Sequence, residues 1–289
     1  MKKILLVVAI LTWHTHSIAQ IGDQETAKMI AYEDTLRMLL DTMDNSPFAE
    51  KRLNASFFVI KTLKNALKTP HSFYYQFGEL SAFSITKPPS GLFKIFTWQV
   101  ELIDGSHRNF GAIQMKSDTL HLFPLVDYGD VYDNLSMQVV DNERWIGAYY
   151  YNIIEKKVKK QKYYFLFGWD GQDTLVNRKY IDVLWFKDGQ PRFGAPIFQL
   201  EDSEELTMRF VLEYKDDAQV GLNLNEEEQR IEYDHLTALM GLPPQVGADK
   251  VPDGTYEGFE WKKKYWKHID KIEYQQLQDG EFPIMESPK

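Results

Sequence analysis

The spacing of apolar positions along the chain changes near Pro70. From Gln24 to Met43 apolar side chains recur at intervals of three to four residues, and a second run with this spacing extends from Phe48 to Leu67. Asn45-Ser46-Pro47 separates the two runs. The pattern predicts an N-terminal helical segment at residues 20–70, in which two antiparallel helices form a hairpin that packs on another part of the chain.

Beyond Pro70, apolar and aromatic runs of roughly 5–10 residues alternate with turn signals, which is typical of β-strands. No segment between Phe73 and Leu224 has the amphipathic helical period that a parallel βαβ crossover needs. We therefore predict an α+β, mainly antiparallel β fold. Its helical hairpin packs on a large β-meander at residues 71–274, arranged as a sandwich or a barrel.

The expected strands are 73–77, 93–103, 110–115, 120–126, 145–154, 163–169, 180–186, 192–193, 208–214 and 219–224, with a last pair within 255–274. Residues 226–240 fit either a short helix or a strand, 241–252 are expected to form a loop, and 275–289 form a polar tail. Asp104-Gly105 and Asp188-Gly189 predict tight turns, because this pair readily takes positive φ.

The first 19 residues have the order of a secretory signal peptide. Lys2 and Lys3 precede an apolar run, Ile4–Trp13, and the small residues Ser17 and Ala19 follow. The run is too short to span a bilayer, which needs about 20 residues. We expect cleavage after Ala19, which leaves a soluble mature chain in the periplasm or outside the cell.

Composition excludes several kinds of chemistry. The chain has no cysteine, which excludes disulfides, thiolate metal sites and a thiol nucleophile. Its formal net charge is −9, and loss of Lys2 and Lys3 with the signal makes it −11. Such a charge argues against nucleic acid as a partner. No later segment is apolar for long enough to be a transmembrane segment.

Five short motifs resemble a group of exported proteins of unknown function from Bacteroidetes-type bacteria. These motifs are Tyr163–Gly171, Tyr180–Leu184, Phe193–Phe198, Asp234–Leu236 and Val251–Tyr256. The resemblance implies a setting in the cell envelope, and it implies no activity, cofactor or catalytic residue.

Trp169 and Asp170 are candidate ligand-binding residues at the end of an aromatic run. Trp169 has the ring to stack on a ligand, and Asp170 can accept hydrogen bonds from its hydroxyl groups. Alternatively, Asp170-Gly171 is a hairpin turn and Trp169 covers the core, which the turn chemistry favours. Asp253-Gly254 invites the same interpretation as a turn.

Asp234 and His235 are a second candidate pair, because a carboxylate can orient an imidazole for proton transfer. Neighbours in sequence rarely face each other, however, and the sequence contains no G-x-S-x-G or H-E-x-x-H motif. The histidines of the mature chain are dispersed, so we predict no tightly bound transition metal and no cofactor.

Asp127, Asp130 and Asp133 are the candidates for a cation site of the Ca²⁺ type, because Ca²⁺ takes oxygen ligands. Their spacing does not match an EF-hand loop, which favours a solvated acidic loop instead.

Two lysine-rich segments alternate with aromatic runs. Lys156–Lys162 lies between two expected strands, and Lys262–Lys264 precedes Tyr265 and Trp266. We predict that residues 145–154 and 163–169 pair as antiparallel strands with the first lysine run at their tip. Such a tip either contacts lipid headgroups or a polyanion, or protects the hairpin edge from pairing with other chains.

Because no catalytic motif is present, the leading interpretation is a non-catalytic exported protein with a binding or structural role in the cell envelope. Its expected partner is an envelope protein, a peptide or a glycan. The alternative is an exported hydrolase that uses a pair of carboxylates, with glycan as its candidate substrate.

The mature protein should begin within about two residues of Gln20, since Ala19 completes the small-x-small cleavage site. N-terminal sequencing of protein recovered from its native host tests this. Retention of Met1 in the envelope fraction would contradict it.

Overall fold

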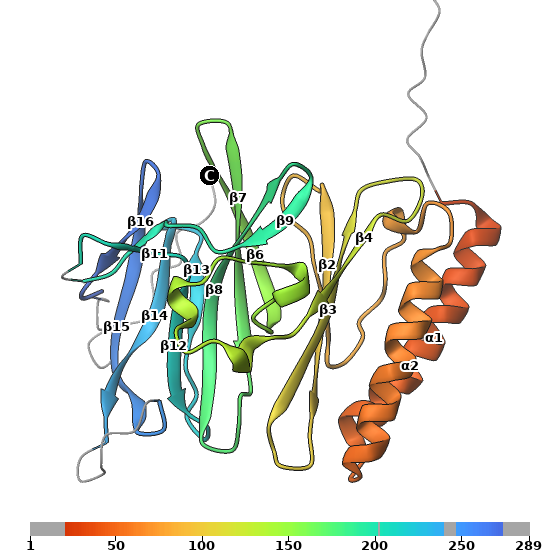
Figure 1. Ribbon diagram of the computed structural model, residues 1–289, viewed down its shortest axis with the longest axis horizontal. Helices are drawn as coiled ribbons and strands as arrows, with labels where there is room; N and C mark the ends of the chain where they lie inside the picture. Colours follow the sequence, from red (N-terminus) through yellow and green to blue (C-terminus); the bar gives the residue numbers. More distant parts are fainter. Residues whose placement is uncertain (1–20, 202, 240–246, 274–289) are drawn as a thin grey trace, which may run out of the picture.

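The computed structural model describes residues 21–201, 203–239 and 247–273 (Figure 1). Helix α1 spans Asp23–Asn45 and helix α2 spans Ala49–Leu67, and a mostly antiparallel β region follows. The α+β fold class is therefore confirmed. Within the described ranges, no helix is long and apolar enough to cross a membrane. The signal segment 1–19 and the tail 275–289 lie outside the described residues.

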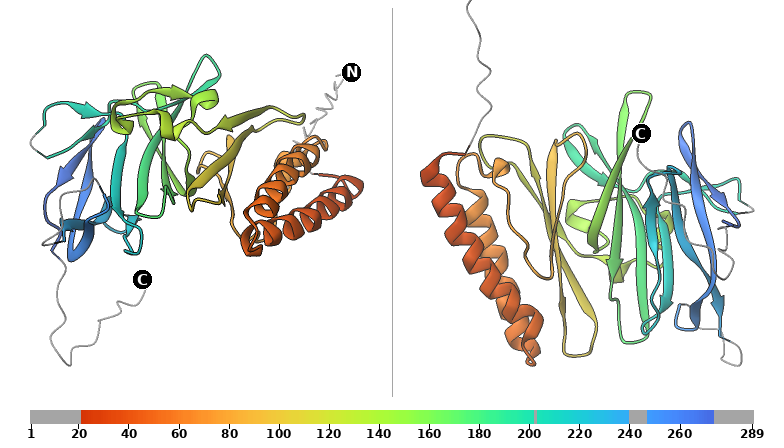
Figure 2. Two further views of the ribbon diagram at one scale, coloured as in Figure 1. Left: turned by 60° about the horizontal axis from the view of Figure 1, so that its bottom comes forward. Right: turned by 180° about the vertical axis from the view of Figure 1, so that it is seen from behind.

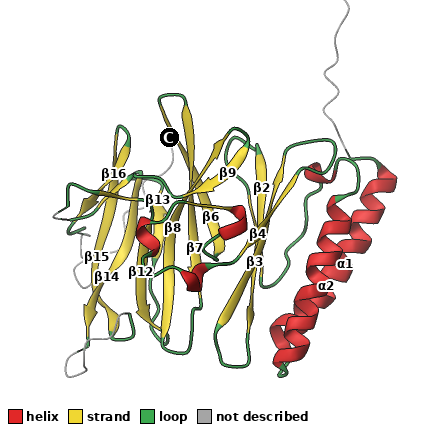
Figure 3. Cartoon of the chain, in the orientation of Figure 1, coloured by secondary structure: helices red, strands yellow, loops and turns green. Residues whose placement is uncertain are grey.

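The strands form three sheets, each built mainly from strands that are consecutive in the chain (Figure 3). The first sheet has the order β1-β2-β3-β4, with β1 Phe83–Thr86, β2 Phe93–Glu101, β3 His107–Met115 and β4 Leu122–Val126. The middle sheet has the order β5-β9-β8-β7-β6, with β5 Val140–Asp141, β6 Tyr149–Val158, β7 Gln161–Asp170, β8 Val176–Lys187 and β9 Gln190–Phe193. Strand β12, Phe210–Lys215, also pairs with β8.

The outer sheet has the order β11-β10-β16-β15-β14-β13. Its strands are β10 Phe198–Gln199, β11 Leu206–Thr207, β13 Leu222–Asn225, β14 Arg230–Ala238, β15 Lys250–Lys262 and β16 Tyr265–Ile269. Strands β10 and β16 pair in parallel, whereas the other neighbours in the three sheets are antiparallel. Short 3₁₀ helices occupy Ser72–Tyr74, Gly129–Val131, Leu135–Met137 and Asn142–Arg144.

The helical hairpin and the three sheets follow one another across the molecule as layers (Figure 2). Leu36, Leu40 and Val59 of the helices pack against Phe96 and Trp98 of the first sheet. A second apolar cluster joins the first sheet to the middle sheet, and a third joins the middle sheet to the outer sheet. The middle sheet is therefore covered on both faces.

Strand β7 explains why one aromatic run in the sequence is continuous. Tyr164 and Leu166 belong to the cluster shared with the first sheet, whereas Phe165 and Phe167 belong to the cluster shared with the outer sheet. All four are almost completely buried. Because successive side chains point to opposite faces of a strand, a strand covered on both faces needs apolar residues at successive positions.

One expected strand is absent, and one undecided region proves to be a strand. Residues 73–77 were expected to form a strand, and this prediction is wrong, since Ser72–Tyr74 is a 3₁₀ helix. Side-chain hydrogen bonds hold this apolar segment against its neighbours: the Tyr75 hydroxyl donates to Glu33 Oε2 at 2.6 Å, and Lys94 Nζ donates to the Tyr75 carbonyl at 2.7 Å. Residues 226–240, which fitted either a helix or a strand, contain strand β14.

The Asp-Gly pairs do not all form turns. Asp188-Gly189 and Asp104-Gly105 lie between paired antiparallel strands, as predicted. Asp170-Gly171 lies at a hairpin, as predicted, since β7 and β8 pair in antiparallel fashion. Asp170 itself is not a turn residue, because it is the buried last residue of β7, and residues 171–175 form the connection to β8.

The turn predicted at Asp253-Gly254 is wrong, because this pair lies within β15, which begins at Lys250 inside the expected loop. Gly254 has a φ of +86°, and the register of β14 with β15 shifts between Asp234 and Leu236. The positive φ of Gly254 therefore belongs to a β-bulge-like irregularity in the pairing of β14 with β15, and not to a hairpin turn.

The lysine hairpin is confirmed, although its first strand begins at Tyr149 and residues 145–148 lie outside it. Strands β6 and β7 pair in antiparallel fashion, with Val158 opposite Gln161, so Lys159-Lys160 is a two-residue turn. Part of the lysine run lies in the strands: Lys156 is opposite Tyr163, and Lys157 is opposite Lys162.

A fully buried ion pair lies inside the middle sheet. Arg209 and Asp182 are both 0% exposed, and Arg209 Nε donates to Asp182 Oδ1 at 2.9 Å. The Tyr150 hydroxyl donates to the second oxygen of Asp182 at 3.1 Å, and Arg209 also donates to the carbonyl of Leu135. The pair thus ties strand β8 to the segment that precedes β12.

Replacing Asp182 by asparagine should lower the free energy of unfolding by about 3–5 kcal/mol, because it leaves the Arg209 charge buried without a counter-charge. Urea denaturation measures this. The matched control is Asp34→Asn, whose side chain is 66% exposed and pairs with Arg37 at 2.8 Å. This change should cost less than about 1 kcal/mol. Equal losses in the two variants would contradict the role of the buried pair.

Candidate functional site

A pocket lined by aromatic and polar side chains lies where the helical hairpin, the first sheet and the middle sheet meet. Its volume is about 310 Å³. We call it the Trp169 pocket, and it is lined by Met43, Asp44, Arg52, Ala82, Gln99, Glu101, His107, Tyr149 and Trp169. Of the residues predicted from the sequence, Trp169 alone lines it.

Arg52 joins the helical hairpin to the end of β2 and so builds one wall of the pocket. Its guanidinium donates to the carbonyls of Ser46 at 3.0 Å, Glu101 at 3.1 Å and Leu102 at 3.4 Å. It also pairs with the Glu101 carboxylate at 3.6 Å. Because these contacts cross from α2 to β2, they keep this wall in place.

A network of side-chain amides runs from the pocket lining into the protein, from half-buried Gln99 to buried Asn109. Gln99 Nε2 donates to Asn109 Oδ1 at 2.6 Å and to the Trp169 carbonyl at 3.2 Å. Asn109 Nδ2 donates to Asp170 Oδ1 at 2.8 Å, and its backbone N–H donates to Asp127 Oδ2 at 2.9 Å. Asn109 therefore bridges two of the carboxylates that the sequence singled out, Asp127 and Asp170.

Burial changes the proton affinity of both carboxylates. It raises the pKa of Asp170 from 3.8 to about 7; the hydrogen bond from Asn109 opposes this rise, and the negative charge of Asp127 adds to it. Burial also raises the pKa of Asp127, against the hydrogen bonds from the backbone N–H groups of Gly129 and Asn109. At neutral pH a large share of Asp170 therefore holds its proton.

Trp169 and Asp170 point to opposite sides of β7, as successive strand residues do. Burial raises the pKa of Tyr214 to about 12, and hydrogen bonding with the Trp169 side chain opposes this rise. The ring of His107 lies edge-on to Trp169, with 6.0 Å between ring centroids. A Cβ on Gly171 would lie 2.8 Å from His107 and 3.0 Å from Trp169, so a glycine here lets the two rings approach each other.

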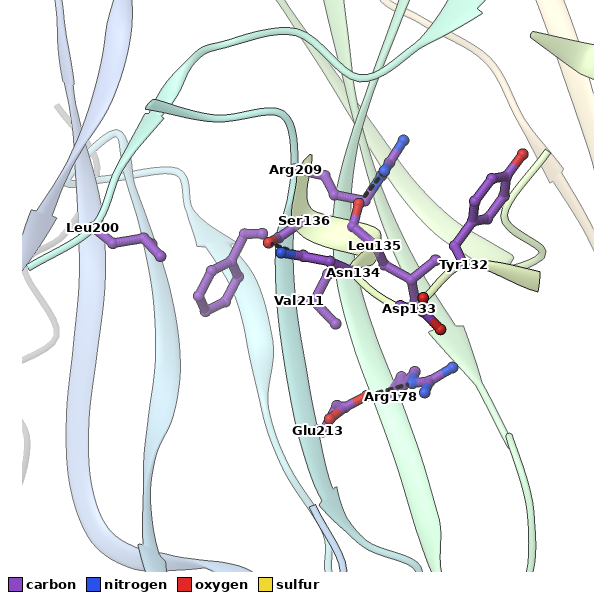
Figure 4. Close-up of a pocket in the computed structure, with 11 residues that line it drawn as sticks. Tyr132, Asp133, Asn134, Leu135, Ser136, Arg178, Leu200, Arg209, Val211 and Glu213 are labelled. Atoms are coloured by element: carbon purple, nitrogen blue, oxygen red, sulfur yellow. Dashed lines mark hydrogen bonds and ion pairs between the residues drawn. The ribbon is translucent and has the colours of Figure 1, made fainter. Parts of the chain in front are cut away.

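The three aspartates of the candidate cation site do not converge. Asp127 Oδ1 accepts from the backbone N–H of Gly129 at 3.0 Å, while Asp130 and Asp133 are exposed. Asp133 lines a second pocket, beside the ion pair of Arg178 and Glu213 (Figure 4). Within the described ranges, no group of three or more histidine, aspartate or glutamate side chains is arranged to hold a metal ion.

Asp234 and His235 make separate contacts. Asp234 Oδ2 accepts from the backbone N–H of Gly221 at 2.6 Å. His235 Nδ1 lies 2.8 Å from Asp253 Oδ2, and its Nε2 lies 3.5 Å from Glu257 Oε1. The carboxylate that orients His235 is thus Asp253, from the next strand, and Asp234 plays no part in it.

Glu257 links this histidine to another. Its second oxygen lies 2.9 Å from Nε2 of His268 and accepts from the Tyr233 hydroxyl at 2.8 Å. Strands β14, β15 and β16 therefore carry a chain of imidazoles and carboxylates across the outer sheet.

Sequence reasoning missed Gln99, Asn109 and His107, which complete the Trp169 pocket and its supporting network. One local signal was present, because Gln99 is a polar residue between Trp98 and Val100 in an apolar strand. A polar residue at such a position needs a hydrogen-bond partner if it is buried. Identifying that partner requires the register of β2 with β3, which pairs Gln99 with Asn109.

Comparison with protein-family models, with curated proteins and with solved structures finds no match for this chain. The resemblance to exported proteins of Bacteroidetes-type bacteria therefore stays a prediction.

Asp170 should make the protein less stable as the pH rises from about 4 to about 7. Below pH 3.8 the Asp170 carboxyl is protonated in both the folded and the unfolded protein. Between pH 3.8 and about 7 it keeps the proton only in the folded protein. This contribution to the free energy of unfolding therefore falls by about 1.4 kcal/mol per pH unit and is lost above the folded pKa.

Asp170→Asn should remove this dependence, since the amide cannot ionise. Urea denaturation across this pH range, for the wild type and the variant, measures the difference. The control Asp133→Asn changes an exposed carboxylate and should follow the wild type. A constant difference between wild type and Asp170→Asn would contradict the raised pKa.

Proposed function

We propose that this chain is a non-catalytic binding protein of the cell envelope that is exported by its N-terminal signal. Its ligand is a neutral mono- or disaccharide held in the Trp169 pocket. The proposal rests on the aromatic wall, where Trp169, Tyr149 and His107 converge from strands of two sheets. Aromatic rings suit the apolar face of a sugar, and the polar groups beside them suit its hydroxyls.

The charges and the size of the pocket support a neutral, small ligand. Arg52 is balanced by Glu101 at 3.6 Å, and Asp44 adds another carboxylate to the lining, so the pocket has no excess positive charge for an anion. A volume of about 310 Å³ lies at the lower end of the range for ligand pockets.

The contacts of Asp127 and Asp170 favour binding over hydrolysis. A glycosidase needs carboxyl groups that reach the scissile bond and a water molecule. Asp170 is only 7% exposed and accepts from Asn109, and Asp127 accepts from two backbone N–H groups. Both carboxylates therefore support the wall of the pocket, and the carboxylate-pair hydrolase is the weaker alternative.

Cellobiose and N,N′-diacetylchitobiose are suitable probes, and isothermal titration calorimetry measures their binding. Trp169→Ala should weaken the binding of whichever sugar binds by at least about tenfold, equivalent to about 1.4 kcal/mol, because it removes the stacking face. Tyr128→Ala is the matched control, because Tyr128 is an exposed aromatic residue outside the pocket.

The proposal would be contradicted if neither sugar binds, or if Trp169→Ala and Tyr128→Ala change the affinity equally. Turnover of 4-nitrophenyl glycosides that disappears in Asp170→Asn would establish the hydrolase instead.

A further inference from the structure

Two hairpins of this protein end in the same pair of residues. Lys159-Lys160 joins β6 to β7, and Lys263-Lys264 joins β15 to β16. The first lysine of each pair has a positive φ, 56° for Lys159 and 54° for Lys263. Glycine takes this conformation at a lower cost in free energy than lysine does. Backbone geometry alone therefore does not explain a lysine in either turn.

The two turns come from distant parts of the sequence and lie at the same end of the molecule (Figure 1). A groove of about 480 Å³ between them is lined by Lys159, by Lys262–Lys264, and by Val158, Trp261 and Tyr265. We call it the lysine groove. Packing between the sheets brings the hairpins together: Phe165 of β7 contacts Trp261 and Trp266, with ring centroids 5.8 and 5.7 Å apart.

The lysine groove concentrates positive charge in an acidic protein. Lys162 pairs with Glu155 at 3.5 Å, and Lys262 pairs with Glu260. Within the described ranges, no carboxylate lies within ion-pair distance of the four turn lysines, and all four are exposed. Salt screens charges over about 8–10 Å, so an anion at this end responds to these lysines more than to the net charge of −9.

We propose that the lysine groove binds an acidic polysaccharide, a chain of sugars that carry carboxylate or phosphate groups. Trp261 and Tyr265 offer aromatic faces to the sugar rings, and the turn lysines pair with the anionic groups. A membrane surface fits less well. A surface that enters lipid presents aromatic side chains outermost, whereas here the exposed tips are lysines and both aromatic residues are half-buried.

This site shares no residue with the Trp169 pocket, so the two proposals can fail separately. The test uses the mature chain and measures its affinity for polygalacturonate, with neutral dextran as a control polymer. Polygalacturonate should bind, its affinity should fall when salt is raised from about 50 to about 200 mM, and dextran should not bind at the groove. Trp169→Ala should leave the affinity for polygalacturonate unchanged.

The main variant replaces Lys159, Lys160, Lys263 and Lys264 by glutamine. It should lose affinity for polygalacturonate by at least about tenfold, because the four unpaired charges are removed. The matched control replaces four exposed lysines of the helical hairpin by glutamine, with the same change in net charge: Lys28, Lys61 and Lys64 in the helices, and Lys68 at the C-cap of α2. The control should bind within about twofold of the wild type. Equal losses in the two variants would show an effect of net charge alone and would overturn the proposal.

A second variant, Lys159→Gly with Lys263→Gly, separates binding from folding. Glycine suits the positive φ of both turns, so the midpoint of thermal unfolding should not fall, while the affinity for polygalacturonate should. Unchanged affinity in this variant overturns the proposal. Absence of binding of the wild type to polygalacturonate also overturns it. Tighter binding to phosphatidylcholine vesicles that contain about one third phosphatidylglycerol than to polygalacturonate would assign the groove to a membrane surface instead.

Discussion

The burial of strand β7 on both faces is the constraint on which the rest of the structure depends. Its side chains fill two apolar clusters at once, one shared with the first sheet and one with the outer sheet. A strand in this position must be apolar at successive residues, so the run Tyr163–Trp169 leaves no polar face for solvent. The first sheet packs one face on β7 and its neighbouring strands. Its other face packs on the helical hairpin.

Because the middle of β7 is committed to packing, both proposed sites lie at the ends of the β6–β7 hairpin. Trp169, with Tyr149 opposite it, contributes to the Trp169 pocket at one end, and the Lys159-Lys160 turn contributes to the lysine groove at the other. Strand β7 has ten residues, so the two ends are about 30 Å apart. At each end a neighbouring sheet completes the site, the first sheet at Trp169 and the outer sheet at the lysines.

Buried polar groups in the middle sheet are stabilised in two different ways. Asp182 faces the guanidinium of Arg209, so the charge of each has a counter-charge in the core. Asp170 faces the amide of Asn109 instead, and an amide offers a hydrogen bond without a full charge. Burial therefore raises the pKa of Asp170, and the group keeps a proton at a pH where an exposed aspartate does not. Whether each buried carboxylate is charged or keeps a proton therefore depends on the partner that another segment of the chain places beside it.

Local periodicity in the sequence was enough to predict both helices, most of the strands and the pairing of β6 with β7, because these depend on residues close together in the chain. Composition alone excluded disulfides and thiol chemistry. Only the tertiary structure decided that Asp170 is buried, that His235 meets Asp253 and Glu257 instead of Asp234, and that two distant lysine turns line one groove. These features depend on strand register and on the stacking of sheets. A shift of one residue in register reverses every side chain to the opposite face, and no local pattern encodes which sheet that face will meet.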